Sequence, residues 1–356
     1  MAIQRPCSVR SGRGGSFLTS ALRFAGYDLD CSRPTTPTST STSSSLSPAT
    51  HPTKTGAGGV SAGGRYIHML PPDVESARTL LEQYSGIPPE DVDTHVYHMR
   101  DRLWDVYPFA CVGRFRFLSF EFTADAYYQV ALFRLLQAQT QAEPEAAGHE
   151  TRLLDVGCCV GQVLRKLAFD GVDASRLYGT DIEPRFPDLG YDLFRDRDRF
   201  PQTAFVIGDL IKQQGEEDGS EGGSGSGSGG GGDERLDVLD GKMAFIHATS
   251  FFHLFTWDEQ VRAATRMVRF LQPGRRDAMI FGRQVGTMLP RDRNGKAGSD
   301  KVYLHNARSW QKLWDEVGSR TGTKWKTTME PTETIETGAG GVESSLRKMS
   351  FSVVRD

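Results

Sequence analysis

The sequence lacks the features that mark membrane, disulfide-rich and nucleic-acid-binding proteins. It has no run of about 18 apolar residues, so we expect no membrane-spanning helix. Its five cysteines are odd in number and scattered without metal-type spacing, which favours a cytoplasmic protein with reduced thiols and no metal site. The formal net charge is only −3, which excludes a strongly basic nucleic-acid binder by composition.

Hydrophobic residues are also scarce, at 38% of the 356, because glycine, serine and threonine tracts dilute them. Residues 1–64 and 215–233 bury too little apolar surface to offset their ordering entropy, so we expect a disordered tail and a disordered insertion. The folded parts are then residues 65–150, which are helical, and residues 151–356. The first 27 residues hold arginines and no acid, but a tail without targeting meaning is favoured over an organelle transit peptide.

The apolar pattern predicts helices first and a sheet afterwards. Helical spacing starts after a candidate N-cap, Asp73, and covers 74–84, 92–103 and 126–137. From Arg152 on, short apolar runs alternate with helices, which predicts a doubly wound, mostly parallel α/β sheet. The expected strands are 153–156, 177–180, 204–207, 244–247 and 278–281, with helices over 163–169 and 258–271. A helix around 310–317 and strands at 324–329 and 348–354 predict a C-terminal antiparallel hairpin.

The first predicted strand ends in Asp155-Val156-Gly157-Cys158-Cys159-Val160-Gly161. Ligands of open α/β sheets lie at such strand ends. The dinucleotide fingerprint G-x-G-x-x-G does not match, since Gly157 and Gly161 are four residues apart, and the acid would repel a diphosphate. The pattern D-x-G-x-x-x-G instead suits a ligand with a cationic group near Asp155 and a small body close to the glycine backbone.

Two further acids end the next two predicted strands. Asp181 lies 20 residues beyond Gly161, where an acid would hydrogen-bond ribose hydroxyls, and Asp209 ends the third strand. One such aspartate is more often a turn former or helix cap than a ligand. Three of them ending three successive strands favour a ligand site over turns and helix caps.

Residues 154–161 resemble motif I of the class I S-adenosylmethionine (SAM)-dependent methyltransferases, D/E-x-G-x-G-x-G, with Cys159 replacing the middle glycine. The resemblance implies a Rossmann-like class I methyltransferase fold, an N-terminal helical lid, SAM as cofactor, and Asp209 near adenine. The implied SAM site consists of Asp155, Gly157, Cys159, Gly161, Gln162, Asp181, Ile182, Asp209 and Leu210.

The resemblance extends to fungal secondary-metabolite methyltransferases of austinol- and terretonin-type meroterpenoid pathways, through residues 81–89, 161–167, 189–197 and 250–255. It implies methyl esterification of an aromatic polyketide carboxylate that bears a prenyl chain. A carboxylate with a pKa near ~4 needs no general base, whereas a phenol near ~10 would benefit from one.

Two residues are candidates for contact with the acceptor. His253 is placed to touch the nucleophile, although a histidine that hydrogen-bonds within an aromatic cluster fits equally well. Arg283 ends the fifth strand and would grip a substrate carboxylate, with a surface salt bridge as the alternative. Aromatic residues of the lid, such as Trp104, either line an acceptor pocket or, more simply, belong to the core.

Several alternatives stay open at this point. The acceptor is expected to be a small hydrophobic acid or a phenol, and carbon methylation or an inactive SAM-binding scaffold competes with O-methylation. A nucleic-acid substrate is disfavoured: the first 64 residues hold six basic and two acidic side chains, so the rest of the chain carries a net charge of −7. The sequence leaves a homodimer open.

Overall fold

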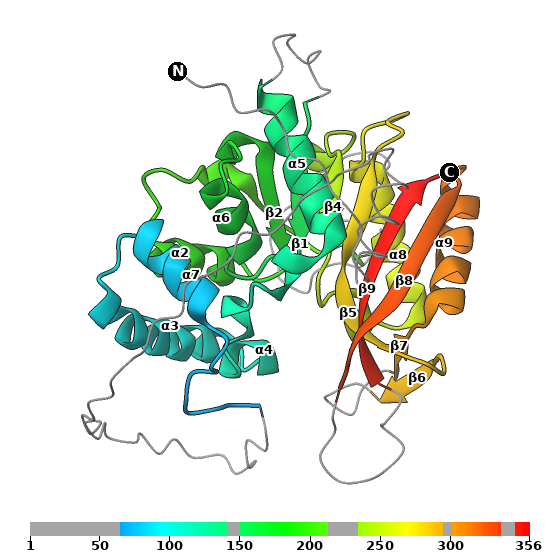
Figure 1. The fold of residues 1–356 in the computed structure, drawn as a ribbon. Helices are drawn as coiled ribbons and strands as arrows, with labels where there is room; N and C mark the ends of the chain where they lie inside the picture. Colours follow the sequence, from blue (N-terminus) through cyan, green and yellow to red (C-terminus); the bar gives the residue numbers. More distant parts are fainter. Residues whose placement is uncertain (1–64, 141–149, 213–233, 295–300, 336–345) are drawn as a thin grey trace, which may run out of the picture.

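The computed structural model describes residues 65–140, 150–212, 234–294, 301–335 and 346–356. Its centre is a seven-stranded sheet in the order β3-β2-β1-β4-β5-β9-β8 (Figure 1). Strands β1 to β5 pair in parallel, and β9 runs antiparallel to both β5 and β8. The strands are β1 (Leu153–Val156), β2 (Leu177–Asp181), β3 (Phe205–Ile207), β4 (Phe245–His247), β5 (Met279–Thr287), β8 (Trp325–Thr334) and β9 (Leu346–Arg355). The predicted class I methyltransferase fold with its C-terminal hairpin is confirmed.

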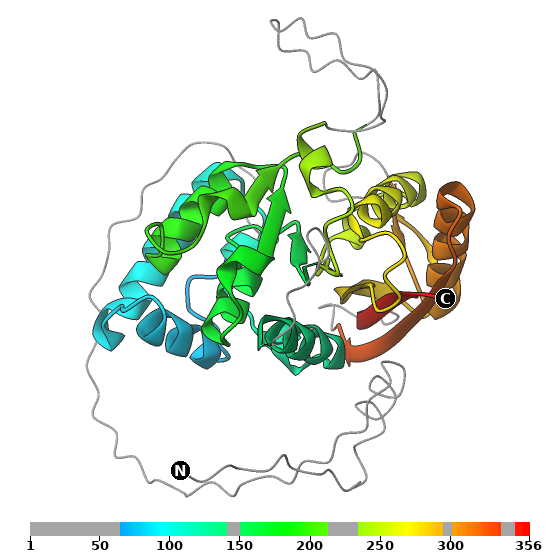
Figure 2. The same cartoon turned by 90° about the horizontal axis from the view of Figure 1, so that it is seen from above.

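Helices cover both faces of this sheet and close two apolar cores (Figure 2). One core lies under α5 (Ala126–Thr140), α6 (Gln162–Phe169) and α7 (Arg185–Phe194). The other lies under α8 (Trp257–Phe270) and α9 (Ala307–Thr321). Because successive strand residues point to opposite faces, Phe245 joins the first core and its neighbour Ile246 the second. Each such side chain stabilises the fold by about 1.5–3 kcal/mol through burial.

The N-terminal helices α2 (Glu75–Gln83), α3 (Val92–Val106) and α4 (Ala110–Gly113) share the first core, and α3 packs on α7. The prediction that Asp73 caps the first helix is wrong. Val74 occupies the N-cap position, and no side chain caps the helix there. The tail 1–64 and the insertion 215–233 fall outside the described residues, and the division at residue 150 stays a prediction.

The edges of the sheet differ from the predicted pattern. Strand β5 runs on past Phe281 to Thr287, because β9 pairs with it along its whole length. A small hairpin, β6 (Arg291–Asn294) and β7 (Lys301–Leu304), was not predicted. In the described part of the chain, no helix combines the length and apolar character needed to cross a bilayer.

Candidate functional site

The turn after β1 is shaped by left-handed backbone. Gly157 and Gly161 both have φ +67°, and Cys159 between them has φ +48°. A Cβ on Gly161 would lie 2.4 Å from Arg165 Nη1, and one on Gly157 would lie 3.2 Å from Phe251 Cδ2. The left-handed backbone favours glycine at both positions, and at Gly161 the lack of space for a Cβ favours it as well. Cys159 adopts a left-handed conformation that glycine adopts without strain, which fits its place at the middle glycine of the motif.

Asp181 ties the end of β2 to this turn. One carboxylate oxygen accepts the backbone N–H of Cys159 at 2.8 Å, and the other accepts that of Glu183 at 3.1 Å. Burial raises the pKa of Asp181, although these backbone hydrogen bonds oppose the shift. Burial also raises the pKa of the Cys158 and Cys159 thiols, so both stay neutral turn residues.

The remaining predicted SAM-site residues surround the same edge. Gln162 is the first residue of α6, and its Oε1 is buried without a hydrogen-bond partner among the described residues. Ile182 is 66% exposed directly after β2, whereas Leu210 is buried after β3. Asp209 accepts the backbone N–H of Ile211 at 2.9 Å. The three predicted acids, Asp155 included, thus end adjacent strands of one sheet.

A buried ion pair supports the turn from below. Arg165 on α6 and Asp196 form two hydrogen bonds, at 3.0 and 3.2 Å, with both side chains fully buried. Arg165 also donates to the Val160 carbonyl at 3.2 Å, and Tyr84 at the end of α2 donates to Asp196 at 2.8 Å. The guanidinium lies within 4.5–5.4 Å of four ring centroids, those of Tyr191, Phe194, Phe200 and Phe205. The sequence pattern predicts no role for this pair.

Asp155 binds His247, a residue for which the sequence pattern also predicts no role. Its carboxylate is 3% exposed, and Oδ1 lies 2.7 Å from Nδ1 of His247, the last residue of β4. The other ring nitrogen of His247 lies 2.7 Å from the Thr249 hydroxyl. Asp155 is therefore held at the junction of β1 and β4, two strands that are neighbours in the sheet but distant in sequence.

Arg283 faces carboxylates of the segment before α5. Its Nε lies 3.3 Å from Asp125, and its Nη1 lies 3.9 Å from Glu121 in η3 (Glu121–Ala124). Lys348 on β9 donates to Glu121 at 2.9 Å. Burial of Glu121 opposes its ionisation, but the hydrogen bond and charge of Lys348 outweigh burial and lower the pKa of Glu121. These contacts form an ion-pair cluster that joins η3 to the sheet. Its members are Glu121, Asp125, Arg283 and Lys348.

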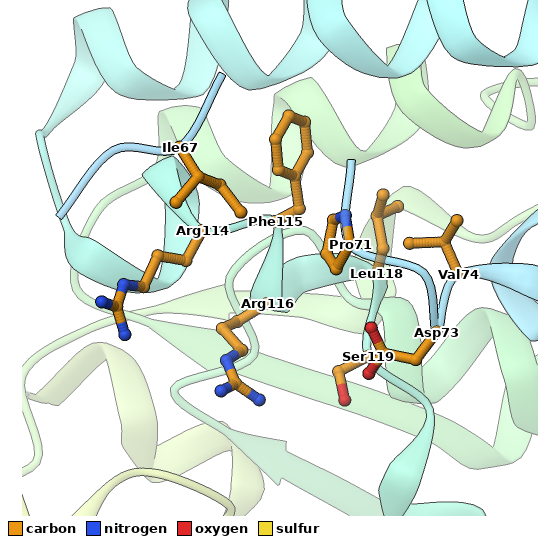
Figure 3. A pocket seen from close by; sticks show the side chains of 9 residues that line it. All are labelled: Ile67, Pro71, Asp73, Val74, Arg114, Phe115, Arg116, Leu118 and Ser119. Carbon is orange, nitrogen blue, oxygen red and sulfur yellow. The ribbon is translucent and has the colours of Figure 1, made fainter. Parts of the chain in front are cut away.

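His253 lies in η7 (Phe252–Leu254), half-buried beside the aromatic pair Phe251 and Phe252. Its contact with an acceptor stays a prediction. Of the aromatic residues in the region predicted to form a lid, Phe115 is buried and lines a cavity of about 190 Å³. Figure 3 shows Arg114 and Arg116 extending away from the Phe115 ring at this cavity. Trp104 packs against Tyr66 at 5.1 Å between ring centroids.

Comparison with known proteins shows the family of this chain. Residues 66–118 match the model of the meroterpenoid methyltransferase N-terminal domain. The chain is 37% identical to the O-methyltransferase phiE of a fungal species, over 75% of this chain and 79% of that protein. It is 34% identical to the asnovolin E/chermesin D methyltransferase nvfJ of Aspergillus novofumigatus, over 70% of this chain and 78% of that protein. The chain belongs to this family of fungal secondary-metabolite methyltransferases.

One further relative and one solved structure are also similar to this chain. The methyltransferase is 33% identical to the O-methyltransferase atr3 of Stereocaulon alpinum, over 82% of this chain and 75% of that protein. Among solved structures, the methyltransferase domain of the citrinin polyketide synthase covers 64% of this chain and 52% of its own, with a TM-score of 0.37 and 16% identity.

The methyl donor of class I methyltransferases is SAM, and the residues of this methyltransferase fit it. The left-handed turn from Gly157 to Gly161 carries no side chain at its two glycines, so its backbone can approach a ligand next to the first strand end. The unpartnered Gln162 Oε1 is an acceptor for a donor group of the ligand. Asp181, an acid at the end of β2, stands where ribose hydroxyls are bound in nucleotide-binding sheets.

Proposed function

We propose that this methyltransferase converts a carboxylate of a small hydrophobic polyketide–terpenoid acid into its methyl ester. The observation that carries the proposal is the joint arrangement of the left-handed glycine turn and Asp181 at one sheet edge, with Arg283 on β5 past the end of β4 in the same sheet. Relatives named as O-methyltransferases support an oxygen acceptor. The meroterpenoid methyltransferase domain at residues 66–118 supports a terpenoid-containing substrate.

Binding and alignment are the tasks of the chain in this reaction. SAM supplies an electrophilic methyl group on a positively charged sulfur. Asp155, Gly157, Cys159, Gly161 and Gln162 would hold its amino-acid part, Asp181 and Ile182 its ribose, and Asp209 and Leu210 its adenine. Methyl transfer to an anion removes charge, so alignment in a water-poor pocket contributes more than acid–base chemistry does.

Arg283 supports a carboxylate acceptor. Its guanidinium is 19% exposed and already lies against the carboxylates of Asp125 and Glu121. A planar guanidinium matches a carboxylate in two-pronged geometry. A substrate carboxylate that replaces Glu121 at the longer 3.9 Å contact would be held by the Arg283 guanidinium.

The test is product analysis with matched acceptors. A prenylated aromatic acid, its amide and its decarboxylated phenol are incubated with enzyme and SAM, and fragmentation in mass spectrometry locates the new methyl group. We expect a methyl ester from the acid and no methyl group on the carboxamide of the amide. A new carbon–methyl bond in the acid, or an ester formed equally well by an Arg283→Gln variant, would contradict the proposal.

A further inference from the structure

A chain of hydrogen bonds links the carboxyl ends of β1 and β4. It runs from Asp155 Oδ1 to His247 Nδ1 at 2.7 Å, and from His247 Nε2 to Thr249 Oγ1 at 2.7 Å. Asp155 and His247 are 3% and 1% exposed, whereas Thr249 is only partly buried. This hydrogen-bond chain therefore leads from the buried carboxylate of Asp155 outward to the hydroxyl group of Thr249.

The carboxylate of Asp155 fixes the direction of the first hydrogen bond. A carboxylate only accepts, so the Nδ1–H of His247 donates to Asp155, and in the tautomer that carries its single proton on Nδ1 the Nε2 is left as an acceptor. The Thr249 hydroxyl then donates to Nε2. The backbone N–H of Arg283 donates to Thr249 Oγ1 at 3.1 Å, so it occupies one of the two lone pairs of that oxygen. The second lone pair can accept a hydrogen bond from a substrate hydroxyl.

We propose that Thr249, His247 and Asp155 take up the proton of a neutral hydroxyl acceptor, so that the enzyme methylates phenols in addition to carboxylates. Thr249 touches the acceptor, and the other two residues act through it. The acceptor proton passes to Thr249 Oγ1 while the Thr249 proton passes to His247 Nε2, and Asp155 stabilises the imidazolium. The electron pair left on the acceptor oxygen forms the O–CH3 bond, and the S–CH3 pair stays on sulfur.

The packing around His247 suits this transient charge. The rings of Phe122 in η3 and Phe281 in β5 lie 5.8 and 5.3 Å from the imidazole centroid and keep water from it. The charged groups beyond them balance one another, because Arg283 and Lys348 are paired with Asp125 and Glu121. Asp155 thus remains the direct ionic partner of the imidazole in the described structure, and the negative charge of Asp155 also acts on Asp181 at the end of β2.

This inference rests on the methyl-transfer function proposed above but not on its carboxylate acceptor. A carboxylate is already ionised at neutral pH and brings no proton to remove. The two acceptor classes therefore respond differently when the hydrogen-bond chain is broken, and this difference is the basis of the test.

The test compares wild type with Thr249→Val, Thr249→Ser and His247→Gln on one aromatic acid and a series of phenols of increasing pKa. In Thr249→Val we expect phenol methylation to fall by about 10²-fold or more, with a loss that grows with phenol pKa, and acid methylation to stay within about twofold. Thr249→Ser keeps the hydroxyl and should retain the phenol activity. Equal losses for acid and phenols, or an unchanged phenol rate, would overturn the inference.

The wild-type enzyme separates this inference from the proposed function. Methyl esters from the acid with no product from any phenol would overturn the inference and leave the proposed function standing. Products from neither acceptor class would overturn both. Melting temperatures of all variants within a few degrees of wild type would show that the rate differences do not reflect unfolding.

A second readout needs no activity. Nitrogen chemical shifts of the His247 ring, identified by their loss in His247→Gln, report its tautomer in the protein without SAM. We expect a neutral ring protonated on Nδ1 and hydrogen-bonded at Nε2, and the Nε2 shift should move in Thr249→Val. A ring protonated on Nε2 would contradict the direction of the hydrogen bonds from Thr249 through His247 to Asp155 and overturn the proposal.

Discussion

At the scale of single residues, the site depends on contacts that hold one five-residue turn in shape. Gly157 and Gly161 supply left-handed backbone, Asp181 fixes Cys159 from the neighbouring strand, and Arg165 holds the Val160 carbonyl from below. Each contact uses a backbone group of the turn, so the side chains of the turn carry little of its geometry. Substitutions in the supporting residues should therefore act on SAM affinity through the backbone.

Gly161→Ala tests the space at the turn. Its Cβ would meet Arg165 Nη1 at 2.4 Å, whereas the Cβ of Gly274→Ala, at the similar φ of +72°, would meet nothing within 4 Å. The left-handed backbone alone costs about 1–2 kcal/mol, and crowding at Gly161 adds about 1–3 kcal/mol. In urea unfolding, Gly161→Ala should lose more stability than Gly274→Ala. In SAM titration, Gly161→Ala should lose SAM affinity and Gly274→Ala should keep it. Equal effects of the two substitutions would show that crowding is absent.

Arg165 and Asp196 test the buried pair. Removing one partner leaves an uncompensated buried charge, so Arg165→Met alone and Asp196→Leu alone should each lower the free energy of unfolding by about 3–5 kcal/mol. The double variant removes both charges and should recover most of that loss. Denaturant titrations of the four proteins measure the coupling. A double variant as unstable as the sum of the single variants would mean that the two side chains act independently.

At the scale of elements, the strand pattern is well predicted and the contacts between strands are less so. The strands around 153–156 and 177–180 were predicted from short apolar runs, and the contact of Asp181 with the first turn follows from their pairing. The contact of Asp155 with His247 requires knowing that β4 lies beside β1, which local patterns do not encode. The Asp73 cap was wrong because aspartate favours turns and helix starts alike.

The ion-pair cluster between η3 and β9 belongs to this scale and makes the stability of the protein depend on pH. The pKa of Glu121 is lowered in the folded protein, so its stabilisation is present above the usual range of a glutamate pKa and is lost as pH falls through the lowered value. Glu121→Gln should cost about 1 kcal/mol at neutral pH, because the site is partly exposed. The difference in melting temperature from wild type should vanish in acid.

Glu330→Gln is the control for that experiment, since Glu330 is an exposed carboxylate on β8. It should leave the melting temperature unchanged at every pH. A Glu121→Gln difference that persists at low pH would show that packing, and not charge, holds η3 on the sheet.

At the scale of the whole molecule, the N-terminal helices and the sheet form one structure. Residues of α2 and α3 share a core with β1, α6 and α7, and Tyr84 reaches the Arg165–Asp196 pair under the SAM turn. The predicted fold needed only the alternation of strands and helices. The buried Arg165 escaped prediction because arginine is rarely buried, and its partner lies 31 residues away.

The central claim is that SAM binds at the sheet edge ended by Asp155, Asp181 and Asp209. Calorimetric titration of the purified protein with SAM and, separately, with NAD tests it directly, with Asp181→Ala as the variant. We predict SAM binding that Asp181→Ala weakens by about tenfold or more, equivalent to about 1.4 kcal/mol, and no heat with NAD. No binding of SAM, or equal SAM affinity in wild type and Asp181→Ala, would contradict the claim.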